Sequence, residues 1–285
     1  MIEQISRSLG GDVESRLVGG EKYYRMASPK ASPKVGLCPE EIQQLELCRG
    51  MVLHLLPEGV RDQVRHTIAK TAVLLPDMNG RERAFASVVD AQIKGRIDYS
   101  PHQEHIASLI QAIQDRTVCE VTYHSPSNPK PKSYAFAPMK IISYHEALYV
   151  AGWRVEDKGE PTPRHSIKLA VHRLKKVIRQ RRVFDIEMDS GQTAELFGFM
   201  KLDELKVKVK FDKETASYIK ERQWSDGQSI HEFKNGNLVL EFTAQSMPEV
   251  VSWLLSFGAH AKVMGPKVLK DQFKSELGKM CALYS

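Results

Sequence analysis

Basic and aromatic side chains gather in one stretch of the chain, between Val121 and Phe184. That stretch holds thirteen Lys or Arg residues and four acidic residues, a local balance of +9, whereas the whole chain carries +6. Arginine forks and lysine ammonium groups bind phosphate, and aromatic rings stack on unpaired bases. The stretch therefore has the composition of a surface for an anionic ligand, with phosphate and nucleic acid as the favoured classes.

The side chains that suit such a ligand are tyrosines, histidines, a lysine and arginines. The candidates are Tyr123, His124, Tyr149, Lys168, His172, Arg173, Arg179, Arg181 and Arg182. Each type also has a structural interpretation. The tyrosines suit a core in which the hydroxyl is satisfied, and the histidines suit a hydrogen-bonded surface. The arginines suit an exposed basic segment without a specific partner, or, at residues 179–182, a solvated helix face.

Strand alternation limits how these candidates combine. In a regular strand Lys168 and His172 share one face, while Arg173 lies on the opposite face. Lys168 and Arg173 therefore reach one site only if the strand bends or ends between them.

Signals for other chemistry are missing from the sequence. It contains no GxSxG, HExxH, P-loop or Rossmann glycine pattern, so we expect no enzyme, no cofactor and no metal. Cys38, Cys48, Cys119 and Cys281 form no CxxC pair and have no His at ligand spacing, so we expect buried, reduced thiols. No apolar run approaches the roughly 20 residues that span a bilayer, and the first residues are no secretory signal. We predict a cytoplasmic protein without a membrane partner.

The first 115 residues are predicted to be mainly helical after a short start. A helix over residues 2–9 and two extended stretches about Gly19-Gly20, a hairpin signal, precede a Pro-rich linker at 28–34. Apolar spacing predicts helices over about 39–57, 60–75 and 102–114. In the first of these the apolar face comprises Ile42, Leu45, Cys48, Val52 and Leu55. We interpret this region as a connector or dimerisation element.

Short strands follow from residue 117. Alternation predicts strands at 118–122, 134–143, 148–153 and 167–171, which together favour a small β-barrel. From residue 205 the order is strand, helix, strand, strand, helix, strand and a final helix, the split βαβ pattern of a ferredoxin-like fold. Trp224 and Trp253 are expected in its core. Lys206, Lys208 and Lys210 are expected to protect a sheet edge or to cover a solvent face.

Several motifs resemble the WYL-domain family of bacterial transcriptional regulators. The run Leu148-Tyr149-Val150 keeps the Tyr of the family's Trp-Tyr-Leu strand, and residues 168–174 resemble its alternating basic strand, with Arg173 kept and His172 in place of Asp. Residues 121–124 and Pro138 also match. Residues 253–258 and 263–269 resemble the WCX extension that follows WYL domains, and residues 23–26 and 37–41 look like the exit from the family's winged helix-turn-helix.

This resemblance implies an α+β, multidomain chain. The expected parts are a remnant of the winged helix-turn-helix at 1–30, a helical linker at 31–115, an Sm-like or SH3-like WYL barrel at 116–184, a connector at 185–204 and a ferredoxin-like WCX domain at 205–285. Two helices of the winged domain would precede this sequence in the family, so only its wing hairpin is expected.

The resemblance also implies a function and partners. We expect a homodimeric transcriptional regulator whose barrel senses an anionic effector, single-stranded nucleic acid or a nucleotide, and so controls DNA binding. The alternative is a stand-alone module that binds nucleic acid or a partner protein and has no promoter recognition of its own.

Overall fold

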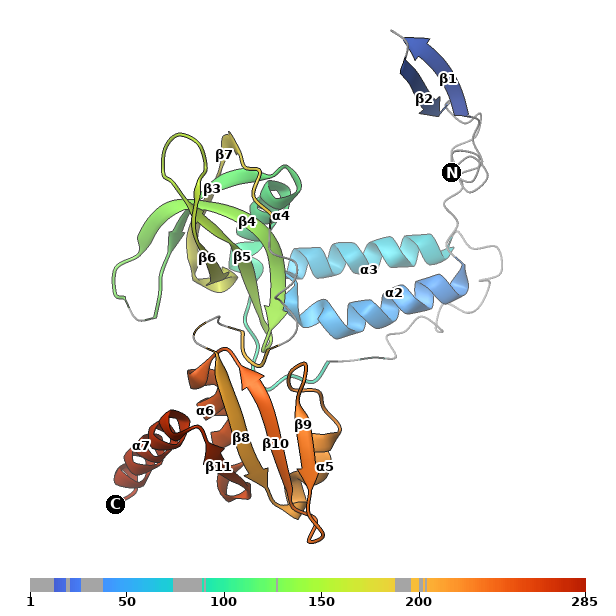
Figure 1. Ribbon diagram of the computed structural model, residues 1–285. Helices are drawn as coiled ribbons and strands as arrows, with labels where there is room; N and C mark the ends of the chain where they lie inside the picture. Colours follow the sequence, from blue (N-terminus) through green and yellow to red (C-terminus); the bar gives the residue numbers. More distant parts are fainter. Residues whose placement is uncertain are drawn as a thin grey trace. The chain divides into compact units, whose positions relative to one another are not determined.

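The computed structural model describes residues 13–18, 21–26, 38–73, 89, 91–126, 128–187, 196–199, 202 and 204–285. The chain divides into two compact units, residues 1–104 and 105–285 (Figure 1). The helix predicted at 2–9 and the linker predicted at 28–34 lie outside the described residues.

The first unit begins with the predicted hairpin. Strands β1 (Val13–Val18) and β2 (Glu21–Met26) pair antiparallel, with Val18 opposite Glu21, so Gly19-Gly20 connects them. Helix α2 (Pro39–Val52) follows, and its start is capped because the Cys38 amide donates to Glu41 Oε2 at 2.8 Å. A 3₁₀ turn (Leu53–Leu55) leads into helix α3 (Glu58–Val73).

Only part of the apolar face predicted for α2 and the turn after it is buried. Ile42 and Leu55 are buried, but Leu45, Cys48 and Val52 are exposed. The prediction was wrong at these three positions, because apolar spacing identifies a stripe without saying which side of the helix is covered. Within the described residues the covered side instead includes Glu46, whose carboxylate pairs with Arg49 at 2.6 Å.

Helix α4 (Gln103–Gln114) begins two residues before the second unit and belongs mostly to it. This helix buries Ile106, Leu109 and Ala112 and leaves Ile110 exposed. A five-stranded antiparallel sheet follows, in the spatial order β6-β5-β4-β3-β7. Its strands are β3 (Thr117–Tyr123), β4 (Lys132–Tyr144), β5 (Ala147–Val155), β6 (Pro163–Ala170) and β7 (Leu174–Val183). The sheet is the small barrel predicted from the sequence.

A glycine permits the close packing between β4 and β5. Gly152 lies opposite Pro138, where the register of β4 shifts, and the Phe136 ring covers it. A Cβ atom on Gly152 would lie 2.7 Å from Cζ of Phe136 and would also overlap the Ala137 carbonyl oxygen. Only glycine fits here without moving the backbone. The core beside this contact comprises Val118, Ala135, Ala137, Val155 and Phe184.

Strand β6 ends one residue earlier than the strand predicted at 167–171. The strand ends at Ala170, and a 3₁₀ turn (Val171–Arg173) leads directly into β7. The segment 179–182 belongs to β7, so the alternative of a solvated helix face was wrong. Most side chains of β7 are half-buried or exposed, which removed the apolar alternation by which a strand is recognised.

The C-terminal module has the predicted ferredoxin-like order. Its antiparallel sheet runs β11-β8-β10-β9. The elements are β8 (Leu205–Phe211), α5 (Lys213–Lys220), β9 (Ser229–Glu232), β10 (Leu238–Ala244), α6 (Met247–Leu255), β11 (Ala261–Gly265) and α7 (Lys267–Leu283). Trp224 and Trp253 pack against the core, as predicted.

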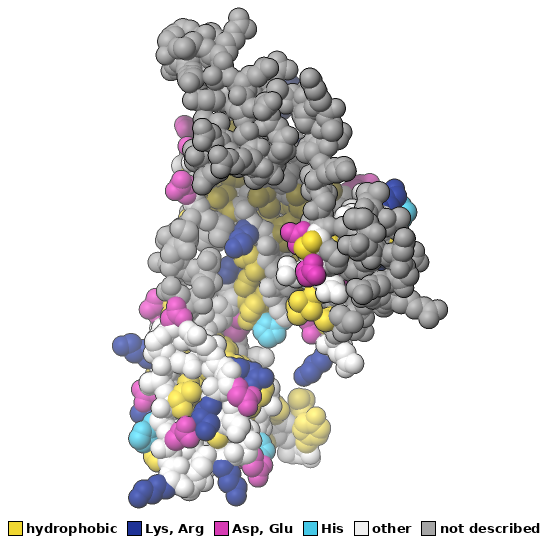
Figure 2. Space-filling view, turned by 90° about the vertical axis from the view of Figure 1, so that its right-hand side faces the viewer, with side chains coloured by type: hydrophobic (Ala, Val, Ile, Leu, Met, Phe, Trp, Pro, Cys, Tyr) yellow, Lys and Arg dark blue, Asp and Glu magenta, His cyan; other side chains and the backbone are white. Residues whose placement is uncertain are grey.

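The lysines of β8 cover a solvent face of this sheet. Because β8 lies between β11 and β10, it is no sheet edge, and the edge alternative for Lys206, Lys208 and Lys210 was wrong. Lys208 pairs with Glu241 of β10 at 2.5 Å. On the face drawn in Figure 2, basic and acidic side chains of the C-terminal module are interspersed.

The cysteines are free thiols, but three of the four are exposed. Cys119 is buried in β3, whereas Cys38, Cys48 and Cys281 are exposed, so the expectation of buried thiols was wrong for these three. Burial raises the pKa of the Cys119 thiol to about 11. No helix among the described residues is long and apolar enough to cross a membrane.

Candidate ligand-binding surface of the barrel

Tyr149 and Lys168 lie on the same face of the barrel sheet. Tyr149 of β5 is opposite Ala170 of β6, and Lys168 precedes Ala170 by two residues. Residues two apart on one strand share a face, so the tyrosine and the lysine are diagonal neighbours. Both side chains are half-buried.

Phe199, which precedes β8, packs against this pair. Its ring centre lies 4.6 Å from that of Tyr149 at an angle of 58°, and 4.4 Å from that of Tyr144, nearly parallel at 12°. The Lys168 ammonium nitrogen lies 4.1 Å from the centre of the Phe199 ring and donates to the Phe199 carbonyl oxygen. Phe199 is therefore held by stacking, by a cation–π contact and by a hydrogen bond.

Glu249, in the first turn of α6, completes this cluster. Its Oε2 accepts hydrogen bonds from the Tyr144 hydroxyl at 2.5 Å and from the Phe199 amide at 2.8 Å. Burial raises the pKa of the Tyr144 hydroxyl, and the hydrogen bond to Glu249 adds to that rise. Burial lowers the pKa of Lys168, and the negative charge of Glu249 opposes that change.

A second group of candidates meets where β3 ends and the turn after β6 begins. Tyr123 is the last residue of β3, opposite Leu174, and the His124 amide donates to the Arg173 carbonyl oxygen at 3.1 Å. His172 and Arg173 lie in the 3₁₀ turn. Because β6 ends at Ala170, the alternation that separated Lys168 from Arg173 does not continue through the turn.

The three arginines of β7 have different surroundings. Arg179 pairs with Asp115, which follows α4. Arg182 donates to the carbonyl oxygens of Glu156 at 2.8 Å, Gly159 at 2.9 Å and Asp157 at 3.2 Å, so its guanidinium holds the loop between β5 and β6. Arg181 is exposed and makes no ion pair with any described residue.

Sequence reasoning missed several residues of this surface. Tyr144, Phe199 and Glu249 form the cluster with Lys168, but none of them was a candidate. One available signal was the aromatic-Gly-aromatic run Phe197-Gly198-Phe199 inside a connector. Tyr134 was also missed: it carries the Arg154 guanidinium 5.3 Å from its ring centre, and burial, with Tyr123 nearby, raises its pKa to about 12.

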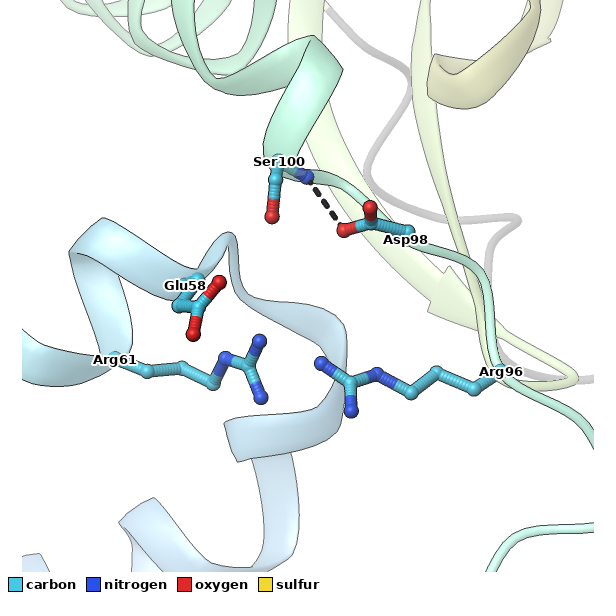
Figure 3. Close-up of a pocket in the computed structure, with 5 residues that line it drawn as sticks. All are labelled: Glu58, Arg61, Arg96, Asp98 and Ser100. Atoms are coloured by element: carbon cyan, nitrogen blue, oxygen red, sulfur yellow. Dashed lines mark hydrogen bonds between the residues drawn. The ribbon is translucent and has the colours of Figure 1, made fainter.

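The first unit contains a polar pocket of about 480 Å³ (Figure 3). The guanidinium groups of Arg61 and Arg96 point toward one another in it, and Glu58 and Asp98 also line it. Asp98 Oδ1 accepts the Ser100 amide at 2.9 Å, and this hydrogen bond lowers the pKa of that carboxyl. The negative charges of Glu58 and Asp98 offset the positive charges of the two arginines. The pocket therefore attracts an anion less strongly than the barrel surface does.

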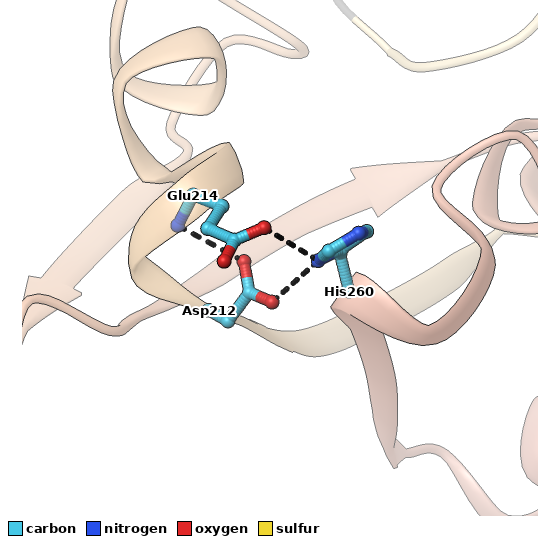
Figure 4. A group of neighbouring side chains, drawn as sticks. All are labelled: Asp212, Glu214 and His260. Carbon is cyan, nitrogen blue, oxygen red and sulfur yellow. Dashed lines mark hydrogen bonds and ion pairs between the residues drawn. The ribbon is translucent and has the colours of Figure 1, made fainter.

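Among the residues that the structure describes, the side chains of Asp212, Glu214 and His260 come close enough together to hold a metal (Figure 4). Asp212 Oδ1 accepts the amides of Glu214 and Thr215 at the start of α5, and His260 Nδ1 lies 2.6 Å from Asp212 Oδ2. These groups already satisfy one another, so the cluster is a helix cap joined to an ion pair.

Comparisons with known proteins bear on both parts of the second unit. Residues 104–179 match the family model of the WYL domain, and residues 203–281 match that of the WCX domain. No curated protein sequence matches the chain.

Two solved structures are similar to the chain at low identity. The Proteasome accessory factor B/C (PafBC) of Arthrobacter aurescens is 12% identical, with a TM-score of 0.31, over 92% of this chain and 39% of that one. A CRISPR Cas-related protein is 9% identical, with a TM-score of 0.46, over 99% of this chain and 70% of that one. The chain thus spans well under half the length of the first.

Proposed function

Because this chain belongs to the WYL-domain regulator family, with a WYL domain followed by a WCX domain, we propose that it is a transcriptional regulator with an effector-binding barrel. The effector is single-stranded nucleic acid or a nucleotide, and its binding controls the affinity of the protein for DNA. Differential affinity of the effector for two arrangements of the protein supplies the switch.

Unpaired cations at the start of β7, beside the end of β3, carry this proposal. Arg173 and Lys175 make no ion pair with any described residue, and the same holds for Arg181 near the other end of β7. Lys176 and Arg179 are instead paired with Glu120 and Asp115. Tyr123 lies opposite Leu174, the residue between Arg173 and Lys175. Free cations beside a half-buried tyrosine suit a chain of phosphates and unstacked bases.

Homodimerisation is part of the proposal and is supported by α2. Leu45, Met51 and Val52 are exposed on this helix at 45%, 53% and 46% of their full accessible surface. Leu45 and Val52 are seven residues apart and so lie on one face of the helix, an arrangement of exposed apolar side chains that suits a helix–helix contact. Sedimentation of the protein should give a dimer, and Leu45→Asp should shift it toward the monomer.

The test of effector binding is fluorescence anisotropy with a labelled oligothymidylate. Affinity should fall steeply with salt concentration, because neutralised phosphates release counterions. Arg173→Ala should weaken binding and should lower the slope of log affinity against log salt by about 0.7, the loss of one phosphate contact on a single strand. The thermal midpoint should stay nearly unchanged.

Lys262→Ala is the matched control, because it removes one exposed positive charge from β11 of the C-terminal module. It should leave both affinity and slope nearly as in the wild type. Absence of binding by the wild type at low salt would contradict the nucleic-acid proposal, and a large loss of stability in Arg173→Ala would show that Arg173 is structural.

A further inference from the structure

We propose that Tyr144, Tyr149 and Lys168 form a subsite for an unpaired nucleobase of the effector, and that Phe199 occupies this subsite as an internal plug. Effector binding then requires Phe199 to leave. The inference rests on the proposed function, since it assigns one part of the effector to one part of the barrel and makes the neighbouring segment its competitor.

The contacts of Phe199 are those that a base would make. Its ring is nearly parallel to that of Tyr144 at 4.4 Å and lies beneath the Lys168 ammonium group at 4.1 Å. A planar base stacks on a tyrosine in the same way, and a lysine at its edge can neutralise a phosphate. Phe199 is 8% exposed, because its ring fills the space beside Tyr144 and Lys168. The Phe199 ring and a nucleobase therefore cannot lie in this subsite at the same time.

The plug is anchored from the C-terminal module. The Phe197 ring packs 5.2 Å from that of Phe242 and 5.1 Å from that of Trp253, and the Phe197 amide donates to the Thr243 carbonyl oxygen at 3.1 Å. Two residues later, Phe199 packs on the barrel. In a regular strand the rings at 197 and 199 would share a face, yet they enter different clusters.

Gly198 permits this change of direction. Its φ is +114°, and a Cβ atom there would lie 2.9 Å from the Ser246 Cβ atom. The Gly198 carbonyl oxygen also accepts a hydrogen bond from the Gln245 side chain at 2.6 Å. These contacts fix the backbone at Gly198, and its positive φ turns the chain so that Phe199 contacts the barrel.

Displacement of Phe199 would change the hydrogen bonds of Glu249 in the C-terminal module. Glu249 in α6 binds both the Phe199 amide and the Tyr144 hydroxyl through one oxygen. When Phe199 leaves, Glu249 loses one of these two donors, and the barrel loses its contact with the anchored segment. Occupation of the subsite is thereby coupled to the attachment of α6 to the barrel.

The first test compares Phe199→Ala with the wild type, again by oligothymidylate anisotropy. Without a competing ring the subsite is always open, so binding should tighten about tenfold, within the range of one base-stacking contact. Phe233→Ala, which removes an exposed ring from the C-terminal module, is the matched control and should not change affinity. An oligonucleotide of equal length with abasic sites should bind the wild type and Phe199→Ala equally, because it offers phosphates without bases.

A second measurement uses the unaltered protein. Chymotrypsin cleaves after phenylalanine, and the buried Phe199 should be cut slowly in the free protein and faster once oligothymidylate is added. Thymidine monophosphate at saturating concentration should have the same effect, because the subsite takes a single base, whereas the abasic oligonucleotide should have none.

The outcomes separate this inference from the function on which it rests. If no variant and no wild-type protein binds oligothymidylate at low salt, the proposed function fails. If the wild type binds with the expected salt dependence, but Phe199→Ala binds no more tightly or the oligonucleotide protects Phe199 from cleavage, the plug is refuted while the function stands.

Discussion

The Lys168 ammonium group lies 4.1 Å from the centre of the Phe199 ring, although 31 residues separate the two in sequence. Lys168 belongs to the segment matched by the WYL model, whereas Phe199 lies between the two matched segments. The ammonium group of a basic barrel residue is therefore in contact with a side chain that lies outside both matched domains. Under the proposed function, the affinity of the barrel for its anionic effector depends on the connector as well as on the barrel itself.

Arg181 and Arg182 are adjacent in β7 but should respond differently to truncation. Arg182→Ala removes hydrogen bonds to three carbonyl oxygens of the β5–β6 loop and should cost about 1–3 kcal/mol of unfolding free energy. Arg181→Ala removes an exposed charge and should weaken oligothymidylate binding with little change in stability. Urea denaturation and anisotropy, measured on both variants, check this. A stable Arg182→Ala protein with impaired binding would assign Arg182 to the ligand instead.

Gly152→Ala should destabilise the barrel. The added methyl group would overlap the Ala137 carbonyl oxygen and the Phe136 ring, and overpacking of this kind costs about 1–3 kcal/mol. Gly278→Ala is the control, because nothing lies within 4 Å of a Cβ atom there and the residue is inside helix α7. It should gain about 0.5–1 kcal/mol. Equal unfolding free energies for the two variants would contradict the assigned packing.

Glu146→Gly should stabilise the hairpin between β4 and β5. His145 and Glu146 form its two-residue turn with φ of +45° and +60°, the left-handed region that glycine enters without strain. Removal of the backbone strain at Glu146 should add roughly 1 kcal/mol to the unfolding free energy. Glu160→Gly, in the next loop and without a positive φ, should give no gain. Thermal unfolding of both variants measures the difference.

The ion pair of His260 and Asp212 should make stability depend on pH in two windows. The hydrogen bond and charge of Asp212 raise the pKa of His260 above its ordinary 6.5, and His260 lowers the pKa of Asp212 below its ordinary 3.8. The His260 contribution is therefore complete below pH 6.5 and is lost as pH rises through the raised value. The Asp212 contribution is present above pH 3.8 and is lost as pH falls through the lowered value.

An NMR titration of the His260 imidazole checks this pair. Asp212→Asn keeps an N-cap residue for α5 but removes the charge, so the pKa of His260 should return toward 6.5 and the dependence of stability on alkaline pH should weaken. An unchanged His260 pKa in this variant would contradict the assignment.

Elements with strong local signals were predictable from the sequence. In the C-terminal module, residues 206–211 alternate strictly, Asn235-Gly236 is a hairpin-turn signal, and Gly258 follows a helical apolar pattern. These patterns specified the ferredoxin-like order because they describe interactions between near neighbours. The barrel strands before residue 170 were recognised for the same reason. β7 was missed because its side chains are half-buried or exposed on both faces and carry charge rather than alternation.

The partner of each candidate was decided only by the tertiary structure. Nothing local to Arg182 distinguishes it from Arg181, yet one holds a loop and the other is exposed. Nothing local to Phe199 places it on Tyr149 and Lys168. The sequence by itself determined which residue types the barrel carries, because composition and alternation are properties of the chain. Which of them remain available to a ligand depends on contacts between distant segments, and those exist only once the chain has folded.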